Sequence, residues 1–264
     1  MYYYGARYYD PRISIFVSVD PLAEKYRNVG GYVYVANNPI NFIDPDGRYI
    51  RVWYQTGTNS NGQAVGRYWD FNGENASAAP DNQFVKDFLA AYNYNVSNGG
   101  GDNMKRAAFD KNEQYELFYV GEMLEADSNN QNGRSFIRWN PLTCLQVENG
   151  DILSPATILE HEFDHSIARV YDTKAFYERG KTSLKDYKNK EEYRVISGSE
   201  TKTARANGEI SANKTQSRYS HSAGQNTRVP VESPTSNKIR TTKNRTDTGS
   251  GSVKLMKGLY NHGR

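Results

Sequence analysis

The chain has 264 residues and a net charge of +3, and only 37% of its residues are hydrophobic, whereas tyrosine and glycine occur 21 and 22 times. This composition is typical of short strands, turns and long loops, and it disfavours an architecture built only from helices. The single cysteine, Cys144, excludes an intramolecular disulfide and is expected to be a small buried residue.

Residues 1–48 alternate short aromatic and β-branched runs with Asp-Pro and Asn-Pro turns. The distinctive stretches read YGARYYDP at 4–11, DPLAEKY at 20–26 and NNPINFIDPDG at 37–47. On these residues, positions 2–48 resemble the RHS repeat-associated core domain. The resemblance implies that upstream repeats in a longer parent protein form a β-shell around a C-terminal toxin.

The same resemblance implies an aspartate-dependent self-cleavage element between Pro39 and Gly47, which contains Asp44 and Asp46. The family usually has leucine after this glycine, whereas this chain has Arg48. The alternative for these positions is an ordinary pair of Asp-Pro turns.

Between residues 49 and 139 the hydrophobic pattern predicts three strands and one helix. The strands are expected at 49–54, 114–120 and 135–139, and the amphipathic helix at 82–94. A loop rich in glycine, asparagine and alanine is expected at 59–80. The strand at 135–139 is interpreted either as the lip of a substrate cleft or as an ordinary core strand.

The strongest motif is H-E-x-x-H at residues 161–165, a pattern found on helices that bind zinc. Ser154 and Pro155 are suited to the start of such a helix, because serine caps free N–H groups and proline lacks one. On a helix, His161 and His165 lie one turn apart and can hold one Zn²⁺ ion, with Glu162 beside them as the catalytic base. The alternative is an ordinary amphipathic helix that matches the motif by chance.

A catalytic zinc needs a third protein ligand, and no histidine follows at a short spacing. The following segment, 189–209, predicts two short helices that are broken at Gly198 and end at Gly208. Its carboxylates are therefore the candidates, with Glu192 preferred and Glu191 and Glu200 as alternatives. Glu200 also has a competing interpretation, as part of a helix-capping box with Ser197.

Residues 134–210 resemble zinc metallopeptidase toxin domains similar to the NleD-like effector peptidases. The resemblance implies His161 and His165 as zinc ligands and Glu162 as the general base that passes a proton to the leaving amine. An oxyanion donor is also required, and Tyr193, Tyr219 and His221 are candidates. Asp164 is unusual for the family and is expected to point away from the metal.

Residues 211–264 hold ten Lys or Arg against two Asp or Glu, which predicts a basic and partly disordered tail. No nucleic-acid motif accompanies this charge, so a nucleic-acid partner is not expected. No apolar stretch is long enough to span a membrane, and residues 1–20 lack the pattern of a signal peptide. We therefore expect delivery into another cell as part of a larger RHS protein.

Together these patterns predict an α+β, zincin-like metallopeptidase domain at 49–210, preceded by a β-rich RHS core segment at 1–48 and followed by the tail at 211–264. The expected function is zinc-dependent endopeptidase cleavage of a target-cell protein by a toxin, with an immunity protein as a further candidate partner. The main alternative is a non-enzymatic RHS shell or surface-interaction fragment in which the H-E-x-x-H helix is degenerate. A third alternative is a nuclease toxin that acts through the basic tail, although no His/Asp nuclease constellation accompanies the positive charge.

Overall fold

The computed structural model describes residues 2–3, 8–10, 15–17, 49–61, 64–120, 127–131, 134–221 and 226–240. The chain divides into two compact units, Met1–Gly47 and Arg48–Arg264. The first unit contains a small antiparallel sheet of β1 (Tyr2–Tyr3), β2 (Tyr8–Asp10) and β3 (Ile15–Phe16). The expected self-cleavage residues, Asp44 and Asp46, lie outside the described residues.

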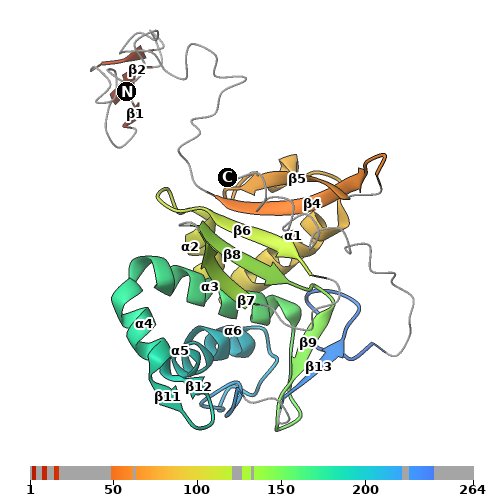
Figure 1. Cartoon of the computed structure of the whole chain (residues 1–264), viewed down its shortest axis with the longest axis vertical. Helices are drawn as coiled ribbons and strands as arrows, with labels where there is room; N and C mark the ends of the chain where they lie inside the picture. The colour runs from red at the N-terminus through yellow and green to blue at the C-terminus, as the bar shows by residue number, and fades with distance from the viewer. Residues whose placement is uncertain are drawn as a thin grey trace. The chain divides into compact units, whose positions relative to one another are not determined.

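The second unit is built around a mixed five-stranded sheet in the order β5-β4-β6-β8-β7 (Figure 1). The three central strands run parallel, and the outer strands β5 and β7 are antiparallel to their neighbours. The strands are β4 (Ile50–Thr58), β5 (Ala64–Phe71), β6 (Tyr115–Tyr119), β7 (Asp127–Gln131) and β8 (Arg134–Trp139). The three strands expected from the hydrophobic pattern are confirmed as β4, β6 and β8.

One expectation for this sheet is wrong, and for the strand at 135–139 the structure decides between two interpretations. The loop expected at 59–80 contains β5, which pairs with β4 along a long hairpin from Ile50 opposite Phe71 to Thr58 opposite Ala64. Gly66 and the flanking polar residues weaken the alternating pattern of this strand, so the sequence alone predicts a loop here. The strand at 135–139 is not at the lip of a cleft, because β8 is hydrogen-bonded on both sides, to β6 and to β7.

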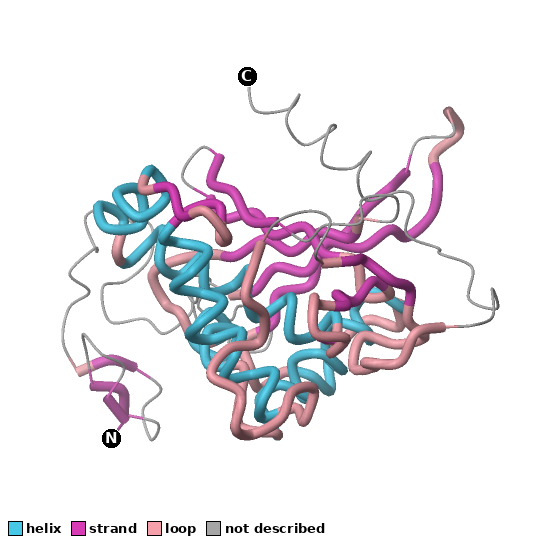
Figure 2. The backbone as a smooth tube through the Cα atoms, turned by 90° about the horizontal axis from the view of Figure 1, so that it is seen from below, coloured by secondary structure: helices cyan, strands magenta, loops and turns pink. Residues whose placement is uncertain are grey.

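Three helices cover one face of the sheet (Figure 2): α1 (Gln83–Ser97), α2 (Asp102–Ala108) and α3 (Pro155–Tyr171). The helix expected at 82–94 is confirmed as α1, and its N-cap is Asn82, whose side chain accepts hydrogen bonds from two backbone N–H groups. A single-turn 3-10 helix at Ala76–Ala78 precedes it.

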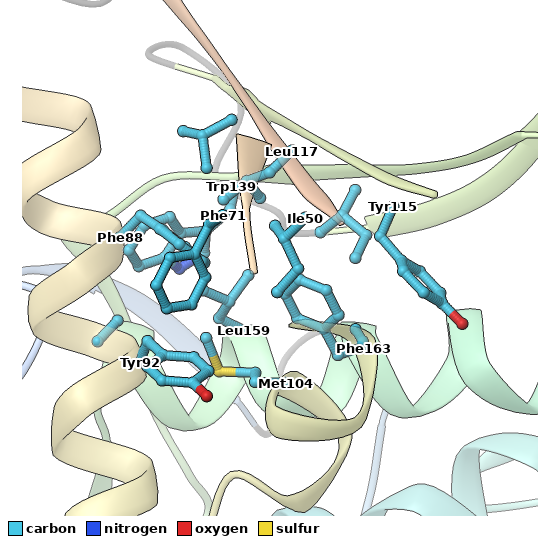
Figure 3. Packing of buried hydrophobic residues seen from close by; sticks show 14 of the residues in the cluster. Ile50, Phe71, Phe88, Tyr92, Met104, Tyr115, Leu117, Trp139, Leu159 and Phe163 are labelled. Carbon is cyan, nitrogen blue, oxygen red and sulfur yellow. The ribbon is translucent and has the colours of Figure 1, made fainter. Parts of the chain in front are cut away.

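The hydrophobic core lies between the sheet and these helices (Figure 3). Leu159, Phe163 and Ile167 are spaced four residues apart on one face of α3 and project into this core. Large side chains from the sheet and from α1 and α2 complete it: Ile50, Phe71, Tyr115, Leu117, Trp139, Phe88, Tyr92 and Met104. One face of α3 is therefore fixed by packing, and its other face is left for the histidines.

Hydrogen bonds also fix the position of α3. The indole of Trp139 donates to Pro155 O at 2.9 Å, and the amide of Asn95 donates to Ala156 O at 2.7 Å. The Glu160 carboxylate accepts two backbone N–H bonds, of 2.8 and 3.0 Å, at the start of α2. The first turn of α3 is thereby tied to both β8 and α1, and its second turn to α2.

After α3 the chain forms a small helical subregion. It begins with α4 (Thr173–Lys181), followed by a hairpin of β11 (Ser183–Leu184) and β12 (Lys188–Asn189). It continues with α5 (Lys190–Val195), a π-helical turn (Ile196–Glu200) and α6 (Thr201–Ala206). The expected break at Gly198 is confirmed, since its backbone angles (φ −98°, ψ −106°) are not helical. Gly208 follows the last helix with a φ of +70°, a conformation that glycine adopts easily. The expected capping box is wrong, because no side chain caps either of the last two segments.

A second, smaller sheet has the order β10-β9-β13, with β9 (Thr143–Gln146), β10 (Ile152–Leu153) and β13 (Thr227–Pro230). Part of the segment expected as a basic tail, 211–264, therefore packs on the domain, and residues 241–264 lie outside the described part. Cys144 is fully buried in β9, as expected. Among the described residues, no helix is both long enough and apolar enough to cross a membrane.

Candidate metal site

The H-E-x-x-H residues lie on α3, which begins at Pro155 with Ser154 as its N-cap, as the sequence predicts. The Ser154 hydroxyl accepts a hydrogen bond of 3.3 Å from Thr157 N. The two histidine rings face each other edge to face, and their Nε2 atoms are 3.1 Å apart. Both rings are buried, so helical spacing alone brings two nitrogen ligands together in a water-poor site.

Glu192 completes the cluster from α5, whose first turn is capped by the Asn189 side chain. Its Oε2 atom lies 3.4 Å from Nε2 of His161 and 3.4 Å from Nε2 of His165. These distances exceed the usual range for an N–H···O hydrogen bond. The three side chains form a group whose ligand atoms lie within 4.8 Å of one another, which is compact enough to hold a metal ion.

The two alternative third ligands lie on the other side of the imidazole rings. Glu200 Oε2 is 2.7 Å from His161 Nδ1, and Glu191 Oε1 is 3.3 Å from His165 Nδ1. Each carboxylate therefore contacts the nitrogen that faces away from Glu192. Of the three glutamates proposed from the sequence, only Glu192 faces both Nε2 atoms.

The charges in this cluster shift the pKa values of its members strongly. Burial alone would lower the pKa of His161, but Glu192 and Glu200 outweigh burial and raise it to about 10. Burial likewise opposes ionisation of Glu192, yet the two histidines hold its pKa well below the usual range. The negative carboxylates and the positive charge on the histidines therefore stabilise each other. A metal cation can supply that positive charge in place of the protons.

The other sequence-predicted residues are placed as follows. Glu162 is buried on α3 between the two histidines of the motif. Asp164 points toward α5 and the π-helical turn, where it accepts a hydrogen bond from Ser199 and pairs with Arg194 at 2.7 Å. Asp164 therefore helps to dock the segment that carries Glu192.

Of the three candidate oxyanion donors, the structure brings His221 to the cluster. Its Nε2 atom is 3.4 Å from Glu192 Oε2, and its backbone N–H donates to Asp186 O at 2.8 Å. Burial lowers the pKa of His221, so its imidazole is neutral near pH 7 and can donate only from one ring nitrogen. Tyr193 instead packs its ring on Tyr187, with ring centroids 5.0 Å apart, and the Tyr219 side chain is half exposed.

Sequence reasoning missed the arginines around the site. Arg179 and Arg194 bind Glu191, and Arg218 binds Glu200. Arg194 follows Glu191 at a spacing of three, which places both on one helix face and is the only local signal for this group. Arg179 and Arg218 come from separate segments, so only the fold brings them to the site.

Comparison with known proteins gives matches to a small part of the chain. A tRNA(Glu)-specific nuclease WapA from Bacillus subtilis subsp. natto is 42% identical over 57 residues, which is 20% of this chain and 2% of that protein. The tRNA nuclease WapA of Bacillus subtilis strain 168 and the tRNA3(Ser)-specific nuclease WapA of Bacillus spizizenii are each 42% identical over 53 residues, which is 19% of this chain and 2% of each protein. No protein-family model and no solved structure matches the chain.

These comparisons correct the family assignment made from the sequence. The resemblances to the RHS core domain and to NleD-like peptidases were wrong, since no such family matches and the similar proteins are named as tRNA nucleases. The assignment as a zinc metallopeptidase was wrong on the same evidence, because cleavage of tRNA is a different reaction from cleavage of a peptide bond. The zincin-like fold stays a prediction, and the chain spans about 2% of the length of the curated relatives it matches.

Proposed function

We propose that His161, His165 and Glu192 bind one Zn²⁺ ion and that the chain is a zinc-dependent hydrolase. The observation that carries this proposal is the spacing of the three ligand atoms, 3.1, 3.4 and 3.4 Å. Zinc bonds nitrogen and oxygen at about 2.0–2.2 Å, so neighbouring ligands of a tetrahedral site lie about 3.3–3.5 Å apart. The donor set therefore fits zinc in both chemistry and spacing.

Two imidazoles and one carboxylate leave a coordination position open, as in hydrolytic rather than structural zinc sites. When bound, zinc supplies Lewis acidity, which brings the pKa of water toward neutrality and polarises the bond to be cut. Glu162 lies next to the first histidine and is suited to accept a proton from the attacking water and return it to the leaving group. The imidazole of His221, beside Glu192, is suited to donate a hydrogen bond to the oxygen on which charge develops.

The similarity to the WapA proteins supports the coarser part of the functional expectation, a toxin-like effector. Those proteins are named as tRNA nucleases, so an RNA phosphodiester is included among the substrates to be tested. The matched segment is a small fraction of each relative, and the reaction proposed for this chain therefore rests on its own site.

The test compares the zinc-loaded chain with Glu162→Gln. Three substrates are tested: bis(4-nitrophenyl) phosphate and purified tRNA for hydrolysis of a phosphodiester, and 4-nitrophenyl acetate for hydrolysis of a carboxylic ester. We expect hydrolysis of at least one, a loss of about 100-fold or more in Glu162→Gln, and loss on chelation that zinc reverses.

Glu160→Gln is the matched control, because Glu160 is buried on the same helix but its carboxylate binds the start of α2. Folding of all three proteins is checked by circular dichroism. Failure of the zinc-loaded chain to hydrolyse any of the substrates, or equal rates in Glu162→Gln and wild type, contradicts the proposal.

A further inference from the structure

Each histidine of the site has a buried carboxylate on the ring nitrogen that faces away from the proposed metal. The partners are Glu200 for His161, at 2.7 Å, and Glu191 for His165, at 3.3 Å. An ionised carboxylate accepts hydrogen bonds and cannot donate them, so these partners favour a proton on the Nδ1 atom of each imidazole. This tautomer leaves the Nε2 lone pair of each ring free for a metal.

The same arrangement is unfavourable without a cation. With both Nδ1 atoms protonated and both rings neutral, the two Nε2 lone pairs would face each other at 3.1 Å beside the Glu192 carboxylate, so the metal-free site binds protons in place of a metal ion. Electron-rich acceptor atoms at this distance repel one another in a buried site. The outer carboxylates therefore select a ring arrangement that a metal ion stabilises.

Glu200 is held in place by a buried guanidinium. Arg218 donates to Glu200 from Nε at 3.0 Å and from Nη2 at 2.8 Å, and the Ser217 hydroxyl donates at 2.5 Å. Both Glu200 and Arg218 are less than 10% exposed. A paired fork of this kind fixes the carboxylate in both position and orientation.

Glu191 is held by two arginines from different segments. Arg179 Nε donates to it at 2.5 Å from α4, and Arg194 Nη2 donates at 2.6 Å from the next turn of α5. Arg194 also pairs with Asp164 on α3. These contacts keep Glu191 against His165 and dock α5, which carries Glu192, on the zinc-binding helix.

We infer that Glu191 and Glu200 are positioning residues, which hold the two imidazoles in the Nδ1–H tautomer with both Nε2 atoms aimed at one metal ion. This inference rests on the proposed zinc site. Partners of this kind on metal-binding histidines raise metal affinity by about 10–100-fold. The arginines pair with both carboxylates and hold them beside the imidazoles.

The experiment measures the zinc dissociation constant of the full chain by competition with a chromogenic chelator. Wild type is compared with Glu191→Gln, Glu200→Gln and the control Glu209→Gln, a buried glutamate that binds the start of α3 and contacts neither histidine. We expect zinc binding to be about 10–100-fold weaker in the first two variants and unchanged in the control. The visible spectrum of the Co²⁺-substituted protein should also change in Glu191→Gln and Glu200→Gln. If these glutamates had only a structural role, variants as thermally stable as wild type would keep the wild-type spectrum.

Removal of Glu200 leaves Arg218 buried and unpaired, which can unfold the domain. If Glu200→Gln does not fold, the double variant Glu200→Gln/Arg218→Met removes both charges and is measured in its place. Wild type that binds no zinc contradicts the proposed function. Wild type that binds one zinc, with unchanged affinity and Co²⁺ spectrum in the folded variants, overturns only the positioning role.

Discussion

The buried carboxyl group of Glu209, which binds the start of α3, should make the stability of the protein depend on pH. Its Oε2 atom accepts a hydrogen bond of 3.1 Å from Ser154 N, at the residue that caps the helix. Glu209 is only 5% exposed, and burial raises its pKa from 4.5 to about 7. Glu209→Gln keeps the size of the side chain and removes its titration.

The magnitude follows from linkage between protonation and folding. A group whose pKa is higher in the folded state binds more protons when folded, so the free energy of unfolding falls as pH rises from about 4.5 to about 7. A difference of about 2.5 pKa units corresponds to about 3 kcal/mol, and the loss is complete above pH 7. The variant lacks this contribution, so its stability relative to wild type should rise by about 3 kcal/mol between pH 4 and pH 8.

Urea denaturation of both proteins at a series of pH values measures this difference directly. All other titrating groups are shared, so their contributions cancel when the two curves are subtracted. A difference between the curves that stays constant from pH 4 to pH 8 would refute the account of Glu209 as a buried carboxyl with a raised pKa.

Further predictions concern the core, a helix cap and the site. Phe163→Ala removes a fully buried ring of α3 and should lower the free energy of unfolding by about 3–5 kcal/mol in urea denaturation, and a cost below about 1 kcal/mol would contradict the packing described. Asn82→Ala removes the cap of α1 and should cost about 1 kcal/mol, with Asn61→Ala at an exposed turn as the control. His221→Ala should reduce hydrolysis by about 100-fold while one zinc stays bound, and loss of the zinc would make His221 a ligand instead of a donor.

The sequence predicts the H-E-x-x-H helix well, because its determinants are local. Ser154, Pro155 and the apolar spacing of Leu159, Phe163 and Ile167 specify where α3 starts and which face is buried. Glu192 is the glutamate that the sequence favours as a third ligand, because it lies one turn before the apolar Val195 and Ile196, and it is the one of the three that faces both Nε2 atoms.

The surroundings of the site could not be predicted in the same way. The sequence leaves Glu200 as a candidate third ligand or a helix cap, whereas the fold places it between His161 and Arg218, a residue 18 positions later. The strand β13 lies in the segment expected as a basic, partly disordered tail, because its four residues show no strand pattern of their own and are stabilised by pairing with β9. Contacts between distant segments decide both cases, and no local pattern reports them.

The central claim is that His161, His165 and Glu192 form one zinc site, and metal stoichiometry tests it most directly. Zinc content is measured by inductively coupled plasma mass spectrometry on the purified, folded chain and on His165→Ala and Glu192→Ala. The account predicts about one zinc per chain in wild type, loss in His165→Ala and much weaker retention in Glu192→Ala. Folded wild type without bound zinc, or variants that retain zinc as tightly as wild type, would contradict it.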